Sequence, residues 1–469
     1  MRRLVALALP LLAACHLRAH APPALPALSG EGEVRVYLQP LPRDAARLAF
    51  SVAAVLASSA AGGDEALEVA LPEISGAAAP DQRLLARGRL PPGSYSGLAL
   101  LISRATIASD GSPADLLVPE EPVRVDVPFK VERNRAVLVR LTLRSGQPLA
   151  QEFRFDAAFL GDAAGPENSA VQLAAYCSTP SLASLTVVDR RARAVSGVLP
   201  TGREPLGVAL DARRLRGYVA LAGDDQIQVL DLVTGEELRR IPLRAGDEPR
   251  EVGLTPDGAL LVAVNSGSNS ASVVDTASGT LVATVPAGDE PSALLLDRDG
   301  RRGYVLNRRS RSITVLDLAT FAVVQTVPTD AEPLRAALSR DGTRLYLVSR
   351  GSAHLTVFSV PEMAVIRTVF LGLGVGTVAV DPRSDLVYVG RADEGRIQVF
   401  DPISALPVDA IEVPGPVSYL AVDHVENALV AVLATLGQVV FVDVARKRLV
   451  ATVDVGAAPY QVAVMGERP

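Results

Sequence analysis

The sequence predicts an all-β protein in which a small β-sandwich domain precedes a seven-bladed β-propeller closed by strand exchange. One short tripeptide motif recurs seven times after about residue 166, which indicates a repeat architecture. The first repeat is one strand short, and one strand is left over at the carboxyl end. No long segment has the 3.6-residue period of an amphipathic helix, whereas short apolar runs between Gly, Pro, Ser and Asp clusters are typical of strands.

Residues 1–15 have the features of a secretory leader. Arg2 and Arg3 precede an apolar run, 4–12, that is too short to span a bilayer, and the run ends in Leu12-Ala13-Ala14-Cys15. This segment resembles the bacterial lipobox. The resemblance implies that Cys15 receives acyl chains and anchors the protein to a membrane of the cell envelope. His16 follows the cysteine in place of Asp, and by resemblance to enteric lipoproteins this favours the outer membrane or cell surface over the inner membrane. The proline-rich residues 16–30 predict a tether.

Residues 31–161 predict the small β-sandwich. Apolar runs at 33–38, 67–71 and 136–143 alternate with turn-forming clusters, and residues 90–107 join a Pro-Gly turn to a long apolar strand. This last motif resembles a strand of transthyretin-like sandwiches, including the DUF4382 group of bacterial lipoproteins. The resemblance implies a spacer or binding module without catalytic activity.

Residues 166–469 contain the repeat, whose motif is an apolar residue, any residue and then an aspartate at a strand end. The final positions are spaced by 42 or 44 residues: Asp189, Asp231, Asp275, Asp317, Ser359, Asp401 and Asp443. The fourth repeat predicts four strands within one period, at 291–296, 303–307, 312–317 and 322–327. We expect the strand-end aspartates to accept hydrogen bonds from turn N–H groups.

The second strands carry a recognisable tetrapeptide, Tyr304-Val305-Leu306-Asn307 in one repeat and Val262-Ala263-Val264-Asn265 in another. These repeats resemble the YVTN-type repeats of β-propellers. The resemblance implies the fold but leaves the function open, because that family includes surface-layer proteins, periplasmic proteins and relatives of lactonases and of quinoprotein or haem enzymes.

The two ends of the array predict how the ring closes. The first repeat supplies three strands, 170–178, 184–189 and 194–200, and residues 459–464 supply a fourth at the carboxyl end. Three strands from one end and one from the other make a whole blade, which removes the open sheet edges.

Composition excludes several classes of function. The formal net charge is −6 with both signs interspersed, so no basic stripe is present for nucleic acid. Tryptophan is absent, and the two cysteines, Cys15 and Cys177, form no CxxC or CxxCH motif. The four histidines are scattered along the chain. We therefore expect no cofactor and no metal centre.

One face of the propeller is the candidate binding surface. A Gly-x-Glu-Pro pattern recurs before the first strand of adjacent blades, and the loops between second and third strands open on the same side. The pattern is equally consistent with simple turn geometry. The candidate residues are Glu204, Glu248, Glu290, Glu332, Asn265, Asn307, Arg309, Arg350 and Arg391.

The leading hypothesis is a membrane-anchored, non-enzymatic binding or scaffold lipoprotein whose partner is a protein or a polar component of the cell envelope. A first alternative is a lactonase-like hydrolase, with a channel metal held by Glu248, Glu290, Glu332, Asn265 and Asn307. A second alternative, suggested by family resemblance alone, is an accessory protein of a periplasmic redox system.

Changing Cys15 to Ser is expected to release the protein from the membrane fraction with its propeller folded, because acyl chains provide the anchor. Cell fractionation followed by immunoblotting measures the release. Retention of the variant in the membrane fraction would contradict the lipobox interpretation.

Overall fold

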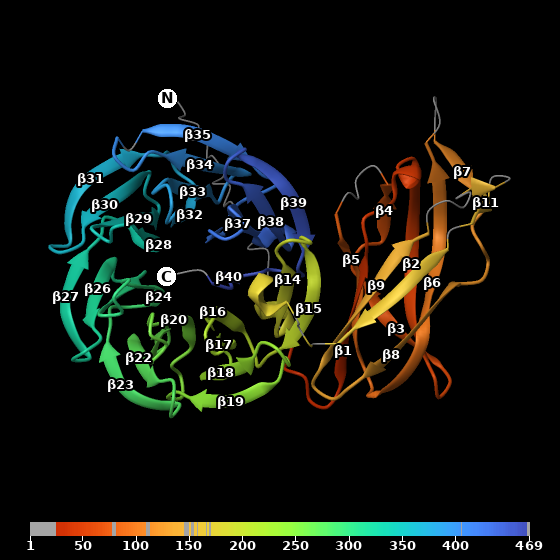
Figure 1. The fold of residues 1–469 in the computed structure, drawn as a ribbon, viewed down its shortest axis with the longest axis horizontal. Helices are drawn as coiled ribbons and strands as arrows, with labels where there is room; N and C mark the ends of the chain where they lie inside the picture. Colours follow the sequence, from red (N-terminus) through yellow and green to blue (C-terminus); the bar gives the residue numbers. More distant parts are fainter. Residues whose placement is uncertain are drawn as a thin grey trace, which may run out of the picture.

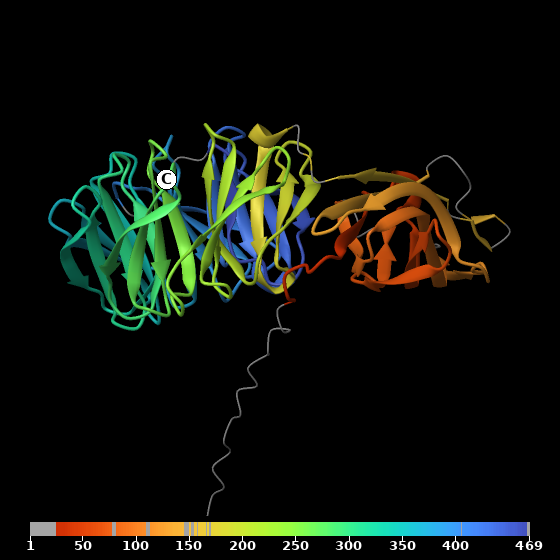
Figure 2. The ribbon, with the colours of Figure 1, turned by 90° about the horizontal axis from the view of Figure 1, so that it is seen from below.

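The computed structural model shows two all-β domains side by side, a ring of blades and a curled sheet packed against its outer edge (Figures 1 and 2). The lipobox and most of the predicted tether lie outside the described residues. The helical segments within the described part are three-residue 3-10 turns, and none is long and apolar enough to cross a membrane. The structure describes residues 25–76, 81–108, 113–144, 150–151, 154–156, 158–165, 167, 170–404 and 406–466.

The predicted seven-bladed propeller is confirmed. Each blade is a four-stranded antiparallel sheet, and six blades consist of consecutive strands. From the centre outward, blade 2 contains β16 (Pro205–Asp211), β17 (Arg216–Leu221), β18 (Gln226–Asp231) and β19 (Glu237–Pro242). Blade 3 contains β20 (Pro249–Leu254), β21 (Leu260–Asn265), β22 (Ser270–Asp275) and β23 (Thr280–Pro286). Blade 4 contains β24 (Pro291–Leu296), β25 (Arg302–Asn307), β26 (Ser312–Asp317) and β27 (Ala322–Pro328).

The remaining consecutive blades follow the same order from the centre outward. Blade 5 contains β28 (Glu332–Leu338), β29 (Arg344–Arg350), β30 (His354–Ser359) and β31 (Ala364–Phe370). Blade 6 contains β32 (Val375–Val380), β33 (Val387–Arg391), β34 (Arg396–Phe400) and β35 (Pro407–Glu412). Blade 7 contains β36 (Tyr419–Asp423), β37 (Ala428–Leu433), β38 (Gln438–Asp443) and β39 (Arg448–Asp454).

Blade 1 closes the ring with three strands from the start of the repeat array and one from the carboxyl end, as predicted. It combines β15 (Ala194–Pro200), β14 (Ser184–Asp189), β13 (Ala174–Thr179) and the carboxyl-terminal β40 (Val462–Val464). β40 pairs antiparallel with β13, so that Ala175 lies opposite Val464 and Cys177 opposite Val462. A buried ion pair at 2.5 Å between Arg190 of blade 1 and Asp423 of blade 7 joins the same two blades. Burial of Cys177 raises the pKa of its thiol, which therefore stays protonated.

The strand-end aspartates act in turns, as predicted. Asp317 accepts hydrogen bonds from the N–H groups of Ala319 and Thr320 at 2.9 and 2.7 Å. Backbone and side-chain hydrogen bonds from Thr320 lower the pKa of Asp317. Asp189, Asp231, Asp275, Asp401 and Asp443 make equivalent bonds. Each carboxylate therefore satisfies N–H groups that would otherwise be unpaired in the turn.

The amino-terminal domain is one ten-stranded mixed sheet, curled so that its two halves enclose a single core. The predicted strands at 33–38 and 136–143 fall within β1 and β9, whereas the run at 67–71 extends two residues past the end of β3. β12 continues to Ala164, slightly beyond the expected boundary. Its strands are β1 (Gly32–Leu38), β2 (Leu48–Ser59), β3 (Asp64–Val69), β4 (Glu73–Ser75), β5 (Arg83–Leu90), β6 (Gly93–Ile107), β7 (Ala114–Leu116), β8 (Val123–Val131), β9 (Ala136–Leu143) and β12 (Phe159–Ala164). A two-stranded ribbon, β10 (Ala150–Gln151) with β11 (Arg154–Phe155), accompanies it.

The two domains share a buried interface. Tyr37 of β1 is completely buried in the same apolar cluster as Val462 and Val464 of the closing strand. Beside it, Arg35 is completely buried and donates hydrogen bonds to Ser184 and Thr186 of blade 1 at 2.5 and 2.8 Å. The amino-terminal domain is therefore fixed against the propeller by both apolar packing and charge-assisted hydrogen bonds.

Changing Val462 to Asp is expected to destabilise the protein by roughly 3 kcal/mol or more, because it places an unpaired charge at a site that is 1% exposed. Deleting residues 458–469 should cause aggregation or early unfolding by exposing the edge of β13. The matched control is Val425→Asp, at a turn position that is 51% exposed. Thermal unfolding and light scattering measure both effects. A deletion variant that stays soluble with an unchanged Tm would contradict strand-exchange closure.

Candidate functional site

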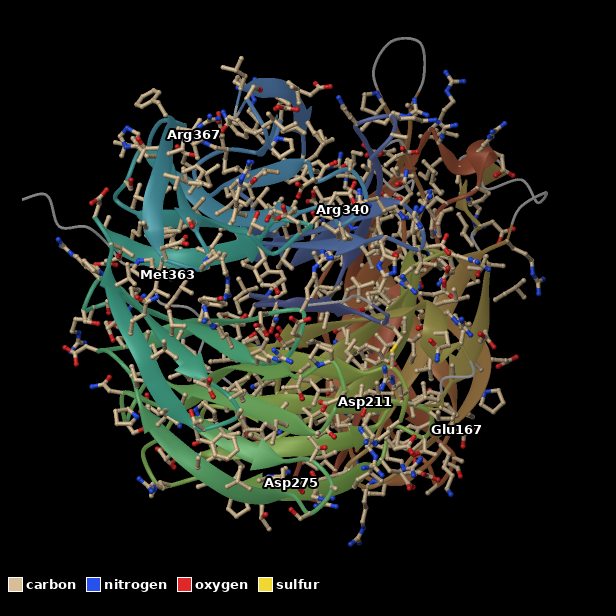
Figure 3. All side chains as sticks on the ribbon, turned by 60° about the vertical axis from the view of Figure 1, so that its left-hand side comes forward. Glu167, Asp211, Asp275, Arg340, Met363 and Arg367 are labelled. Carbon is tan, nitrogen blue, oxygen red and sulfur yellow. The ribbon has the colours of Figure 1, made fainter. Side chains whose placement is uncertain are left out.

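The propeller has two faces joined by a central channel. The rim face consists of the loops that enter each first strand and the loops between second and third strands; the turn face consists of the loops between first and second and between third and fourth strands. The seven innermost strands surround the channel (Figure 1). Side chains bearing nitrogen and oxygen are interspersed over the propeller surface (Figure 3).

Three of the four candidate glutamates occupy a strained turn position on the rim face. Glu204, Glu248 and Glu290 have φ values of 52°, 49° and 54°, in the left-handed region that non-glycine residues seldom adopt. The N–H of Glu248 donates to Asp225 at 2.8 Å, and that of Glu290 donates to Asn269 at 2.9 Å. The repeated pattern therefore has a definite role in turn geometry.

The side chains of these glutamates differ in their partners. Glu290 pairs with Arg308, and with Arg309 at 3.6 Å. Glu332 lies 4.0 Å from Arg350. In the described part of the chain, the exposed carboxylates of Glu204 and Glu248 have no ion pair. Among the described residues, the rim glutamates of blades 2 and 3 are therefore without an ion pair, whereas those of blades 4 and 5 are paired with arginines.

The other three candidates bond within their own blades or the adjoining loops. Asn265 is completely buried and donates to Ser270 and Ser272 at 3.0 and 2.8 Å. Asn307 is also completely buried and makes the equivalent bonds in blade 4. Arg391 is 8% exposed and donates to the carbonyl of Leu371 at 3.0 Å. None of these three side chains is displayed on the rim surface.

The candidate residues do not form a metal centre. Within the described ranges, no three His, Cys, Asp or Glu side chains are grouped closely enough to hold a metal ion. The two asparagine amides proposed as metal ligands donate to hydroxyl groups of their own blades. The hydrolase alternative therefore receives no support from the geometry.

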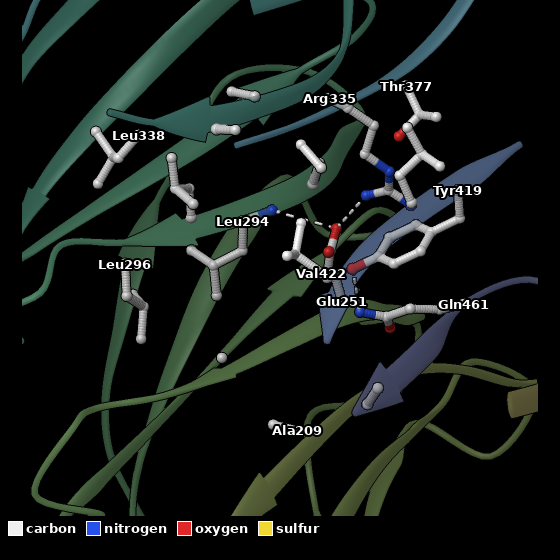
Figure 4. A pocket seen from close by; sticks show the side chains of 18 of the residues that line it. Ala209, Glu251, Leu294, Leu296, Arg335, Leu338, Thr377, Tyr419, Val422 and Gln461 are labelled. Carbon is white, nitrogen blue, oxygen red and sulfur yellow. Dashed lines mark hydrogen bonds and ion pairs between the residues drawn. The ribbon is translucent and has the colours of Figure 1, made fainter. Parts of the chain in front are cut away.

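A polar ring inside the channel was not predicted from the sequence. It crosses the channel at one level of the innermost strands, and we call it the waist (Figure 4). The seven waist residues are Gly207, Glu251, Ala293, Arg335, Thr377, Tyr419 and Gln461.

The centre of the waist is an almost buried ion pair between blades 3 and 5. Arg335 donates to Glu251 at 2.5 Å, with side-chain exposures of 14% and 8%. The N–H of Leu294 donates to the same carboxylate at 3.3 Å, and the guanidinium lies 5.0 Å from the ring centre of Tyr419. Burial opposes the charge on Arg335, but Glu251 raises its pKa above the ordinary value. The guanidinium of Arg335 therefore stays charged.

Gln461 extends this network to the closing strand. Its amide donates to the hydroxyl of Tyr419 at 3.0 Å, and its carbonyl oxygen accepts from the N–H of Val208 at 2.8 Å. The waist therefore links blades across the channel, including blade 1, whose innermost strand comes from the carboxyl end.

The sequence contained one signal for the waist. Its seven residues fall at equivalent positions of the repeat, spaced by 42 or 44 residues. Inner-strand positions are otherwise mainly small or apolar, so Glu, Arg, Tyr and Gln at one such position indicate a polar layer. Comparing the repeats column by column would have found it.

The channel is hollow on one side of the waist. A cavity of about 270 Å³ extends from the waist residues toward the turn face, and it is lined by the innermost strands of all seven blades. A second cavity of about 840 Å³ continues from it at the mouth on the turn face. The accessible hollow therefore opens away from the rim glutamates.

Comparison with known proteins supports the propeller. Residues 172–333 match the family model described as a YNCE-like beta-propeller, in agreement with the YVTN-type resemblance of the repeats. No curated protein matches the sequence. The chain is similar to a functionally unknown protein from Desulfotomaculum acetoxidans DSM 771, with 13% identity and a TM-score of 0.55, covering 62% of this chain and 98% of that chain.

Two further solved structures carry redox-related descriptions. Dihydro-heme d1 dehydrogenase NirN in complex with DHE is 15% identical with a TM-score of 0.50, covering 62% of this chain and 65% of that chain. Hydrazine synthase of Kuenenia stuttgartiensis is 19% identical with a TM-score of 0.49, covering 54% of this chain and 87% of that chain. At these identities the likeness shows the fold alone.

Changing Arg335 to Ala is expected to destabilise the protein by about 3–5 kcal/mol, because it leaves the Glu251 charge uncompensated in the channel. The double variant Glu251→Gln with Arg335→Met should recover much of this loss, since it removes both charges. The control is Arg309→Ala, whose side chain is 76% exposed. Chemical denaturation of the wild type, of Arg335→Met and Glu251→Gln singly, and of the double variant gives the coupling free energy. Additive effects of the two substitutions would contradict a coupled ion pair.

Proposed function

We propose that this protein is a lipid-anchored, non-enzymatic binding or scaffold protein of the cell envelope, in which the rim face of the propeller engages a protein or a polar envelope component. The observation that carries the proposal is that the exposed carboxylates of Glu204 and Glu248, on two adjacent blades, have no ion pair among the described residues. A β-propeller holds such loop residues on a rigid ring, which suits recognition without catalysis.

The start of the described chain supports an orientation for this face. The N–H of Leu25 donates to the carbonyl of Ser181 at 2.9 Å, in the loop between the second and third strands of blade 1. That loop belongs to the rim face. Cys15 precedes Leu25 by ten residues, which span at most about 36 Å when fully extended. An anchor at Cys15 therefore holds the rim face toward the membrane, and the partner is expected at or near that membrane.

The fixed domain interface is consistent with a scaffold role. Arg83 of the amino-terminal domain pairs with Asp454 of blade 7 at 2.7 Å, and the N–H of Val195 in blade 1 donates to Gln82 at 2.6 Å. A domain joined to two blades by polar contacts and a shared core moves with the propeller as one body. It therefore offers a second surface at a defined position relative to the rim.

Photo-crosslinking in intact cells tests this function. A photoreactive amino acid in place of the exposed Ala245, in the rim loop that also holds Glu248, is expected to give a discrete adduct, whereas the same amino acid at position 425 on the turn face gives none. Glu204→Lys should abolish the adduct formed from position 245, because it reverses charge on the adjacent blade. Adducts from position 425 alone, or an adduct that persists with Glu204→Lys, would contradict the rim as the binding face.

A further inference from the structure

The turn-face side of the channel has the form of a small chamber. Its inner end is the waist, because the inner-strand residues that line it lie at the waist or beyond it toward the turn face. From Arg335 at the waist to Leu338 is three residues of extended strand, about 10 Å. The chamber volume of about 270 Å³ is close to the lower limit for small-molecule pockets, roughly 300 Å³.

An aliphatic ring surrounds this chamber. All seven innermost strands place Leu or Val at the same repeat position, three residues beyond the waist. In Figure 4, Leu296 and Leu338 lie on the side of the pocket away from Arg335 and Tyr419. The ring consists of Leu210, Leu254, Leu296, Leu338, Val380, Val422 and Val464. The chamber therefore favours an apolar group.

The mouth above this ring is basic. Arg213, Arg298 and Arg383 line it together with His424, each from a turn between the first and second strands of a different blade. All three arginines are exposed, and within the described chain none of their guanidinium groups has an ion pair. Like charges around one opening repel each other, and an anion at the centre would relieve that repulsion.

The acidic side chains nearest the mouth have other partners. Asp211 pairs with Arg214 at 2.8 Å, and Asp423 pairs with Arg190. Asp381 accepts the N–H of Arg383 at 2.9 Å and holds the turn. Asp299 shares a turn with Arg298 but does not line the mouth. The pKa of Asp257, in the adjoining turn of blade 3, is lowered by a hydrogen bond from the N–H of Ala259 and also by the charge of Arg213. Arg298 and Arg383 are therefore the mouth arginines that have no carboxylate partner within the described chain.

We infer that the chamber and its mouth form a binding site for a small amphipathic anion, with a phosphate or carboxylate head on the arginines and a short apolar tail inside the aliphatic ring. This site lies on the opposite face from the rim, and it stands whether or not the rim binds a partner. Guanidinium groups suit such heads because they donate two parallel hydrogen bonds.

Isothermal titration with alkyl phosphates tests the site on the full chain held in neutral phosphatidylcholine nanodiscs, where no free detergent competes. Inorganic phosphate, butyl phosphate and octyl phosphate are compared below their critical micelle concentrations. Affinity is expected to rise by about threefold to fourfold for each methylene that enters the chamber. Equal affinity for all three probes, or no binding of octyl phosphate at millimolar concentration, would overturn the inference.

Matched charge variants identify the head-group site. Arg298→Ala with Arg383→Ala should weaken octyl phosphate binding at least about tenfold, a loss of one charge-assisted contact or more. Arg301→Ala with Arg448→Ala removes the same charge from exposed positions that do not line the mouth, and it should leave affinity unchanged. Equal losses in both double variants would show a general surface-charge effect and overturn the site.

Two further experiments test whether the alkyl tail enters the chamber and whether the ligand is a free amphiphile or a membrane lipid. Leu254→Trp should fill the chamber. The variant should then bind inorganic phosphate as before but no longer bind octyl phosphate more tightly than butyl phosphate. If this variant does not fold, the comparison of the three probes on the unchanged protein tests the tail site. Vesicles of phosphatidylglycerol are expected not to compete with octyl phosphate, because a free amphiphile fits an enclosed chamber. Binding to vesicles that depends on Arg298 and Arg383, without binding of the monomer, would show a lipid surface instead and overturn the chamber.

Discussion

The pairing of β40 with β13 is the contact on which the rest of the structure depends. It joins two segments almost three hundred residues apart, and it turns a row of blades into a closed ring by completing the first blade. The channel exists only because this ring is closed. The same short segment contains Gln461 of the waist and Val464 of the aliphatic ring. The interface with the amino-terminal domain also depends on it, since Tyr37 shares a core with Val462.

The fold could be predicted because the physical cause of the fold is periodic. Each blade needs the same alternation of buried residues and the same turn acceptors, so the aspartates at strand ends recur and reveal the blade count. The domain interface had no such signal. Arg35 looks like an ordinary charged residue of a half-exposed strand, yet it is completely buried against Ser184 and Thr186 of another domain. Partners that lie about 150 residues apart, outside the repeat, leave no pattern in one sequence.

The same reasoning explains which site residues could be predicted. Glu248 and Glu290 recur because the loop needs a left-handed residue there, so recurrence alone says nothing about binding. Asn265 and Asn307 recur because each satisfies hydroxyl groups inside its blade. The waist is the converse case, in which Glu251 and Arg335 depart from the small or apolar character of most other inner-strand positions. In a repeat protein, residues that are the same in every repeat maintain the fold. A polar residue at a buried position where other repeats have apolar residues is a better indication of a site.

Both kinds of turn on the turn face carry carboxylates that accept hydrogen bonds from turn groups, and the chain as a whole has a net charge of −6. The turns between third and fourth strands lie toward the circumference, and there hydrogen bonds from turn groups lower the pKa of Asp275, Asp317 and Asp401. These outer carboxylates therefore remain ionised through the neutral range. The turns between first and second strands surround the channel and carry Arg298 and Arg383. Hydrogen bonds from turn groups also lower the pKa of Asp257 and Asp341 in these inner turns, so both signs of charge surround the mouth. An anion there is held by direct contact with the guanidinium groups rather than by the field of the whole face. The turn chemistry that the repeat requires thus also shapes the electrostatic field at the mouth.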